Sequence, residues 1–425
     1  MSARTALFLC PSNFSIGELH NAMMAGRDLL ANGWGVRYMV SRRNLDYARS
    51  SGADAELLSE SEKDAAAVLE HVRSLAPDLL LLADHHIWAL EPTAVSIGEL
   101  LELGIPTVAA DSLCLGPRAR TLDLAIAHLQ GAESIRHWFP PTVELPPLPK
   151  GLPVIRAVPV AGPGMAGAFA KYASGPLPTR SKEQVREQLG IEPGRRLVML
   201  ARSAWAAAAH AQLARGRSRG RNRAERPAKT YYQYMNDWFS GVLDLVDEPI
   251  AVVGVQGVSR VEASTNRTRF VSTGLLSADE FLSLVAAADL YVTDNLTSGA
   301  MAQAAYLGTP VIAMQNTTGT GPEGLPSSTT AQRKWGEEVE RFYPGHAFPF
   351  LVNPYGWTEE LTDLLADNPY LAAVPRAEIF DAGSLAKALS HQLSAEADRG
   401  AYEALVRVER DLPGAAALIE GMDLR

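Results

Sequence analysis

The sequence of 425 residues contains very little cysteine, since Cys10 and Cys114 are its only two. Each lies at or near the end of an expected strand, so we expect buried thiols and neither a disulfide nor a metal site.

Long apolar runs are also missing. The apolar run at residues 6–10 is too short for the core of a signal peptide, and no segment reaches the ~18 apolar residues of a membrane span. We therefore expect a cytoplasmic protein without a membrane span.

Positive charge is not in excess either. The 39 lysine and arginine residues are outnumbered by 48 aspartate and glutamate residues, which gives a net charge of -9 at pH 7. A negatively charged protein repels nucleic acid and anionic membrane surfaces, so we expect neither as the main partner.

Several catalytic motifs are absent from the sequence. It contains no HExxH, no Cys/His cluster with zinc-ligand spacing, no GxSxG and no GxxxxGK[ST]. These absences disfavour a metalloprotease, a hydrolase with a nucleophile elbow and a P-loop enzyme.

What the sequence does contain is an alternation of short apolar runs with stretches of helical spacing. At 47% hydrophobic residues, a chain of this length is expected to form two domains. Strands that alternate with helices predict parallel, doubly wound sheets, with ligand groups at the carboxyl ends of the strands. The expected strands are 6–10, 36–40, 79–83 and 105–110 in the first half, and 196–201, 250–255, 269–272 and 290–292 in the second.

Proline and glycine are concentrated between about residues 139 and 178, which indicates the connection between the domains. We expect a Rossmann-like domain over residues 1–160, a linker over 161–180, a second Rossmann-like domain over 181–395 and a helical tail over 396–425.

Residues 210–229 are rich in arginine and almost devoid of apolar side chains. Such a segment cannot form a core, so a mobile, solvated loop is one interpretation. Two others remain open: a lid that closes on a phosphate, and a docking surface for an acidic partner.

The stretch 278–313 reads as helix, short strand, polar turn, helix and strand. The turn contains Asn295, Thr297, Ser298 and Gly299 just before a helix begins. Hydroxyl groups, free backbone N–H groups and the positive end of a helix dipole suit a phosphate or diphosphate. Ser and Thr also cap helices where no ligand is present, so simple capping is the alternative.

The residues around this turn carry a resemblance to a known family. Residues 287–290 (AADL) and 308–312 (GTPVI) resemble the ends of the donor motif of GT-B glycosyltransferases of the UDP-glucuronosyl and macrolide type. The resemblance implies two Rossmann-like domains that face each other across a cleft. It also implies transfer of a sugar from a nucleotide-diphosphate sugar to a small acceptor, as in bacterial secondary metabolism, with no other cofactor and no metal.

Within that motif, Asn295 takes the place of the family's histidine and Leu296–Thr297 the place of two glycines. Ser298 stands at the family's Ser/Thr position. Gln303 replaces the acidic residue that contacts the ribose in the family, and its amide can still hydrogen-bond a hydroxyl group. The resemblance thus implies donor binding by this turn.

Sugar transfer requires charge stabilisation of the departing diphosphate and a base for the acceptor. Arg202, just after the strand 196–201, is the candidate cation, with an ordinary surface arginine as the alternative. Because related enzymes use a histidine early in the first domain, His20 is the candidate base, although it could be an exposed helical histidine. Asp111 could orient His20 if the two side chains meet.

Other polar residues at strand ends in the first half are candidates for the acceptor pocket or for the base. The acceptor-pocket candidates are Asn13, Glu18, His85 and His86, with Phe14, Trp88 and Trp138 as aromatic neighbours. We expect a nucleotide sugar and a small acceptor as partners, with a homodimer as a candidate assembly. A nucleotide-sugar epimerase or hydrolase, and a catalytically inactive partner or regulatory protein of the same fold, are the alternatives.

Overall fold

The computed structural model describes most of the chain, with gaps at both termini and in several connecting segments. The described residues are 4–13, 15–58, 64–90, 93–136, 139–158, 169–170, 178–202, 206, 209–213, 229–255, 267–317, 329–353, 355–366, 368–394 and 396–424.

The first half forms a six-stranded parallel sheet in the order β3-β2-β1-β4-β5-β8. Residue pairs along neighbouring strands run in parallel register, for example Phe8 beside Tyr38 and beside Leu81. The strands are β1 (Thr5–Cys10), β2 (Gly35–Val40), β3 (Ala55–Leu57), β4 (Leu79–Leu82), β5 (Thr107–Ala110) and β8 (Val154–Ile155).

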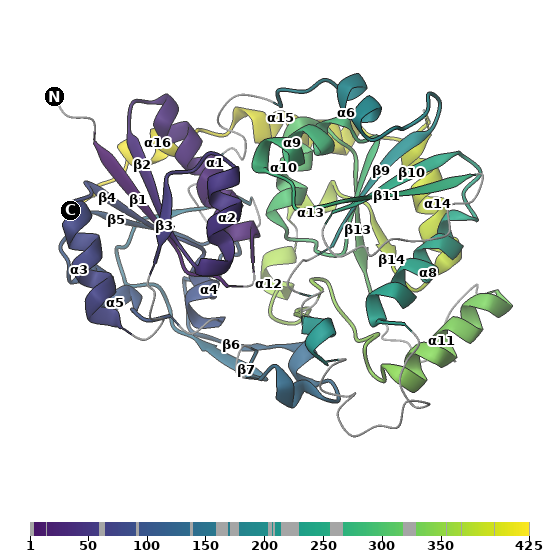
Figure 1. Cartoon of the computed structure of the whole chain (residues 1–425), viewed down its shortest axis with the longest axis horizontal. Helices are drawn as coiled ribbons and strands as arrows, with labels where there is room; N and C mark the ends of the chain where they lie inside the picture. The colour runs from purple at the N-terminus through teal and green to yellow at the C-terminus, as the bar shows by residue number, and fades with distance from the viewer. Residues whose placement is uncertain are drawn as a thin grey trace.

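The second half repeats this topology in a sheet of order β11-β10-β9-β12-β13-β14. In both sheets the strand order reverses between the first strand and the fourth, as in doubly wound Rossmann-like folds. The predicted fold class is confirmed (Figure 1). The strands are β9 (Arg196–Ala201), β10 (Ile250–Val255), β11 (Thr268–Thr273), β12 (Leu290–Thr293), β13 (Val311–Gln315) and β14 (Arg376–Glu378).

Helices cover both sheets. Those of the first half are α1 (Gly17–Ala31), α2 (Arg42–Ser50), α3 (Ala65–Leu75), α4 (His85–Leu90) and α5 (Ile97–Leu101), with short 3-10 turns η1 (Ala125–His128) and η2 (Ala132–Ser134). Those that follow are α6 (Lys182–Gln188), α8 (Tyr231–Leu243), α9 (Ala278–Ala287), α10 (Gly299–Leu307), α11 (Thr330–Phe342), α12 (Thr362–Leu365), α13 (Pro369–Ala372), α14 (Ala382–Leu393), α15 (Gly400–Asp411) and α16 (Ala415–Glu420).

Local sequence explains where several elements begin. Ser181 caps α6, and the Gln184 side chain accepts from the Ser181 backbone N–H, which completes a capping box. Strand β4 consists of four leucines that are all buried, as expected for a central strand with helices on both faces. Gly308 ends α10 with a φ of 80°, a left-handed conformation that favours glycine.

Two regions are more ordered than the sequence predicts. An antiparallel hairpin of β6 (Arg120–Asp123) and β7 (Thr142–Leu145) extends into the stretch expected to be a connection. Helices α11 to α14 and strand β14 occupy residues 330–393, a range for which the sequence analysis names no helix or strand. The hairpin contacts the second half, where the Trp357 indole donates to the Asp123 carbonyl at 2.9 Å. Most of the expected linker and of the arginine-rich segment 210–229 lies outside the described residues.

The end of the chain returns to the first half. Helix α15 packs on α10, whereas α16 packs on α1, where the Ala416 N–H donates to the Asp28 carboxylate at 2.7 Å. Figure 1 accordingly shows both termini at the same half of the molecule. No helix among the described residues is long and apolar enough to cross a membrane.

Candidate functional site

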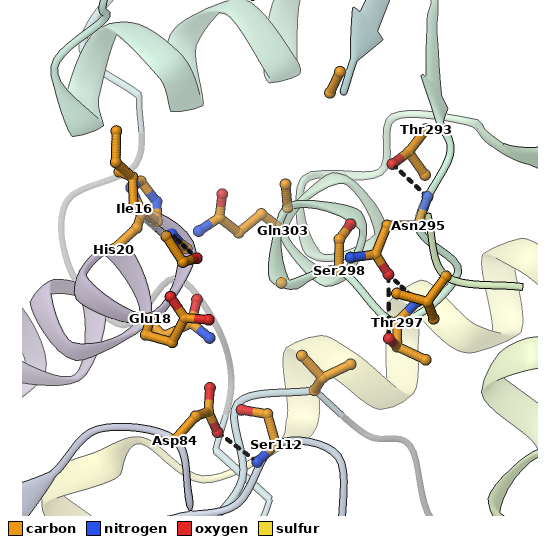
Figure 2. A pocket seen from close by; sticks show the side chains of 18 of the residues that line it. Ile16, Glu18, His20, Asp84, Ser112, Thr293, Asn295, Thr297, Ser298 and Gln303 are labelled. Atoms are coloured by element: carbon orange, nitrogen blue, oxygen red, sulfur yellow. Dashed lines mark hydrogen bonds between the residues drawn. The ribbon is translucent and has the colours of Figure 1, made fainter. Parts of the chain in front are cut away.

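A cavity of about 240 Å³ lies between the two halves. Its wall is built from residues that follow β1, β4 and β5 of the first sheet and β9 and β12 of the second. These loops flank the points where the strand order reverses, which is where ligands bind in open α/β sheets. Figure 2 shows side chains from both halves directed into the same space.

The turn at residues 295–299 forms one wall of this cavity and is held by its own side chains. Asn295 Oδ1 accepts hydrogen bonds from the Thr297 N–H at 3.0 Å and from the Thr297 hydroxyl at 3.2 Å. Ser298 Oγ caps α10 by accepting from the Met301 N–H at 3.1 Å. Helix capping is therefore present, and these side-chain oxygens already have partners within the protein.

Helix α10 nevertheless offers donors to the cavity. The first N–H groups of a helix have no intrahelical acceptor, and Ser298 satisfies that of Met301. Gly299 and Ala300, the first two residues of the helix, both line the cavity. Together with the positive end of the helix dipole, their N–H groups suit an anion.

Arg202 lies at the cavity wall with its charge already offset. Its Nε is 3.4 Å from Oδ2 of Asp294, and the two side chains are 1% and 0% exposed. The guanidinium also lies over the Tyr232 ring, 4.3 Å from its centroid, while Asn353 Nδ2 donates to the same Asp294 oxygen at 2.9 Å. Burial raises the pKa of Asp294 and Arg202 opposes that shift. The alternative that Arg202 is a surface residue is wrong.

Gln303 lies on α10 and is fully buried. Figure 2 shows its amide directed across the cavity towards His20. Neither amide atom makes a hydrogen bond within the described part of the chain. Its proximity favours the protonated form of His20, although the two groups do not meet in hydrogen-bonding geometry.

His20 lies on α1 and is 7% exposed, so the alternative of an exposed helical histidine is wrong. Its Nδ1 is 2.8 Å from the Tyr47 hydroxyl, and its ring contacts Phe281 edge-on at 5.6 Å. Burial, and then the positive charge of Arg27, lower the pKa of His20 to about 4. The imidazole is therefore neutral at pH 7.

Asp111 does not approach His20. Its carboxylate accepts hydrogen bonds from the N–H groups of Leu115 and Gly116, at 2.9 and 3.0 Å, and lies 3.7 Å from Arg156. It stabilises its own loop after β5 and is not part of the described cavity wall. The hypothesised His20–Asp111 pair is replaced by the pair of His20 with Tyr47.

The candidates for the acceptor pocket separate into two groups. Glu18 and His86 line the cavity, with Nε2 of His86 4.0 Å from a Glu18 carboxylate oxygen, and burial lowers the pKa of His86 to about 4. Asn13 and His85 do not line it. His85 instead places Nε2 2.8 Å from the Pro146 carbonyl, and burial lowers its pKa as well.

The aromatic candidates contribute little to the described cavity. The Trp88 indole donates to the Ala83 carbonyl at 3.0 Å and is not part of the cavity wall. Phe14 and Trp138 lie outside the described residues.

Sequence reasoning missed two residues of the site. Asp84 lines the cavity directly after β4, and the strand-end rule that selected its neighbours could have found it. Its carboxylate accepts from the Ser112 N–H at 2.7 Å, and burial raises its pKa. Tyr47, which lies near the end of α2, carried no signal in the sequence because only the tertiary structure brings it to His20.

No group of three or more His, Cys, Asp or Glu side chains in the described ranges is arranged to hold a metal ion. Cys10 and Cys114 are both buried and neither forms a disulfide, which confirms the expectation of buried thiols.

Solved structures share this fold across nearly the whole chain. The spinosyn rhamnosyltransferase SpnG complexed with thymidine diphosphate has a TM-score of 0.53 at 14% identity, covering 98% of this chain and 99% of that one. The glycosyltransferase VinC in complex with DTDP has a TM-score of 0.51 at 14% identity, with the same coverage. These similarities confirm the predicted GT-B architecture.

No curated protein is significantly similar to the chain in sequence. One family profile, described as "Family of unknown function (DUF6365)", matches residues 26–409. Because this match spans most of the sequence, the chain belongs to the family DUF6365.

Proposed function

We propose that the chain is a glycosyltransferase that moves a sugar from a nucleotide-diphosphate sugar to a small-molecule acceptor. One observation carries the proposal: the N-terminus of α10 and the buried His20 line the same cavity from opposite halves. The first can stabilise a departing diphosphate, and the second can accept a proton from the acceptor. A rhamnosyltransferase of the same fold, solved with thymidine diphosphate, supports this class of reaction.

In this proposal the diphosphate binds at the N-terminus of α10. The N–H groups of Gly299 and Ala300 donate to its oxygens, with the Thr297 side chain beside them. Gln303, one turn further along the helix, offers its unbonded amide to a ribose hydroxyl. Arg202 holds the turn through Asp294 and does not bind the phosphate directly.

His20 is the base in this proposal. In this proposal Nδ1 carries the ring proton and donates it to the Tyr47 hydroxyl oxygen, which leaves Nε2, without a hydrogen bond within the described residues, as the atom that accepts the proton. A pKa of about 4 keeps the ring neutral but makes it a weak base. Because a nearby negative charge raises the pKa of an imidazole, a bound diphosphate would strengthen the base when the donor is in place.

Calorimetry with a panel of nucleoside diphosphates tests the donor site. We expect at least one to bind with a dissociation constant below about 1 mM, which corresponds to roughly -4 kcal/mol. A panel in which no diphosphate binds at millimolar concentration would overturn the proposal.

A nucleotide-binding protein without transferase activity is the second candidate. It is favoured by the engagement of Arg202 Nε with Asp294 and of Asn295 Oδ1 with Thr297, which ties both side chains to the protein itself. Release of nucleoside diphosphate that depends on an added acceptor would support the transferase. Diphosphate binding with no turnover across a broad acceptor panel would support the second candidate, and turnover without any acceptor would indicate a hydrolase or an epimerase.

A further inference from the structure

A second cavity, of about 250 Å³, lies in the second half, at the other ends of the strands that lead to the cavity between the halves. Arg196, the first residue of β9, and Asp289, just before β12, line it. The cavity between the halves, of about 240 Å³, is instead lined by Ala201 and Thr293, the last residues of the same two strands. Because β9 and β12 run parallel through the sheet, the two cavities are separate sites of similar size.

The described wall of this second cavity contains three cationic side chains from distant segments. Lys182 is the first residue of α6, Arg196 begins β9, and Arg399 directly precedes α15. Asp289 is the only carboxylate of the described wall. This hollow, called the basic cavity below, therefore carries a net positive charge in a chain whose net charge is -9. Like charges gathered at one place repel one another, so an anion that joins them is stabilising.

Asp289 is already engaged by other groups of the protein. One of its carboxylate oxygens lies 2.6 Å from Lys182 Nζ. The other lies 3.6 Å from Arg186 and accepts from the Leu197 N–H at 2.7 Å. A single negative charge shared between two cations leaves an excess of positive charge at the wall.

The two arginines of the wall are offset less completely. Arg196 lies 3.3 Å from Glu248, but these side chains are 44% and 35% exposed, and such half-exposed pairs contribute little. Arg399 Nη2 donates to the Gln392 carbonyl at 2.7 Å, which holds the guanidinium at the cavity. Its Nε is buried without a hydrogen-bond partner, and no carboxylate forms an ion pair with it, among the described residues. The protein itself thus satisfies Arg399 only in part.

We propose that the basic cavity binds a phosphate group between Lys182, Arg196 and Arg399. Phosphate matches this wall because guanidinium groups bind its oxygens in pairs, and because its charge of nearly -2 offsets more than one cation. Inorganic phosphate and a small phosphate monoester both supply this chemistry, and the experiment separates them. The proposal does not depend on the proposed function, since the site lies away from His20 and from the N-terminus of α10.

Two probes of similar shape but different charge test the site by ligand-observed NMR at pH 7.5. Methyl phosphate is mainly a dianion at this pH, whereas methyl sulfate is a monoanion. The full chain carries Ser298→Asp in this experiment, because the added charge repels anions from the N-terminus of α10. We expect methyl phosphate to bind with a low-millimolar dissociation constant, about fivefold or more tightly than methyl sulfate. No binding of methyl phosphate, or equal binding of the two probes, overturns the proposal.

Inorganic phosphate, followed by phosphorus NMR on the same protein, is the third probe. Binding as tight as that of methyl phosphate would assign the site to free phosphate. Clearly weaker binding would assign it to a phosphate monoester, and either result supports a phosphate site.

Two further changes in the Ser298→Asp chain locate the effect. Arg399→Gln and Arg196→Gln each remove one charge of the wall, and each is expected to weaken methyl phosphate binding about fivefold. Arg341→Gln, at an exposed position of α11, is the matched control and should change nothing. Figure 1 shows α11 at the lower edge of the molecule, whereas α6 and α15 lie at its upper edge. Unaltered binding in both site variants overturns the proposal. If a site variant does not fold, the comparison of methyl phosphate with methyl sulfate decides alone.

The outcome is separable from that of the proposed function. Methyl phosphate binding in a chain that binds no nucleoside diphosphate would support the basic cavity and overturn the transferase. Methyl phosphate binding that is lost in Ser298→Asp but kept in Arg399→Gln would place the phosphate at α10 and overturn this proposal alone.

Discussion

Arg202 and Asp294 form a buried ion pair between the ends of neighbouring strands, with Nε 3.4 Å from Oδ2. Arg202 follows β9, and Asp294 follows β12 at the start of the turn that leads into α10. The pair therefore fixes the position of this turn relative to the sheet. Arg202, which the sequence suggests as a phosphate ligand, therefore pairs with Asp294 in the structure.

Arg202→Met should destabilise the protein, because it leaves Asp294 buried without its countercharge. We expect the free energy of unfolding to fall by about 3–5 kcal/mol, measured by urea denaturation followed by circular dichroism. The double variant Arg202→Met/Asp294→Asn should recover most of this loss. Lys182→Met, which breaks a half-exposed ion pair with Asp289, is the control and should cost less than about 1 kcal/mol. A single variant as stable as the unaltered protein would contradict the assigned role.

Ser298→Asp should weaken nucleoside diphosphate binding without unfolding α10. Aspartate caps helices as well as serine does, but its charge would repel a diphosphate at the same helix end. We expect a loss of affinity of about tenfold or more in calorimetry. Ser181→Asp makes the same change at the N-cap of α6, away from the cavity, and should have no effect on binding. Equal affinity in both variants would show that the diphosphate does not bind at α10.

Tyr47→Phe should release the ring of His20, because the Tyr47 hydroxyl is the described partner of His20 Nδ1. NMR detection of the imidazole nitrogens is expected to show one tautomer in the unaltered protein and a mixture in the variant. In the proposed reaction, kcat should fall about tenfold with little change in KM, since the hydroxyl orients the base and does not bind substrate. Tyr38→Phe, on β2, is the control. An unchanged tautomer signal in Tyr47→Phe would contradict the pairing.

Glu409 should make the protein less stable as the pH rises. It is fully buried on α15, its carboxylate makes no hydrogen bond among the described residues, and burial raises its pKa to about 8 from the ordinary 4.5. Between these values the unfolded chain has lost the proton and the folded chain retains it. Stability from this group is therefore present at acid pH and is lost as the pH rises through the window.

Glu409→Gln should remove this pH dependence. We expect the variant to gain on the order of a few kcal/mol over the unaltered protein at pH 8 compared with pH 5, measured by urea denaturation at both values. Glu403→Gln, at an exposed position of the same helix, should follow the unaltered protein. Parallel pH profiles for the unaltered protein and Glu409→Gln would contradict the prediction.

Local patterns in the sequence were sufficient for the central strands of both sheets, for the two helices of the stretch 278–313 and for the polar turn at residues 295–299, but not for the three-residue edge strands β3 and β14. Runs such as Leu79–Leu82 and capping pairs such as Ser181 with Gln184 act over a few residues, so they can be recognised without the fold. The hairpin of β6 and β7 could not be recognised in this way. Its strands are only four residues long, and β7 lies in a proline-rich stretch; its contacts reach Trp357 in the second half.

The sequence by itself determined two doubly wound sheets and placed polar residues at the carboxyl ends of their strands, because strand and helix periodicity are local properties. Only the tertiary structure decided which of these side chains meet. Arg202 joins Asp294 across 92 residues of chain, and His20 joins Tyr47 across 27. Burial lowers the pKa of His20, so its ring is neutral at pH 7. The buried Asp294 carboxylate, by contrast, lies beside the Arg202 guanidinium. Contact partners and burial depend on the packing of distant segments, which no single stretch of sequence specifies.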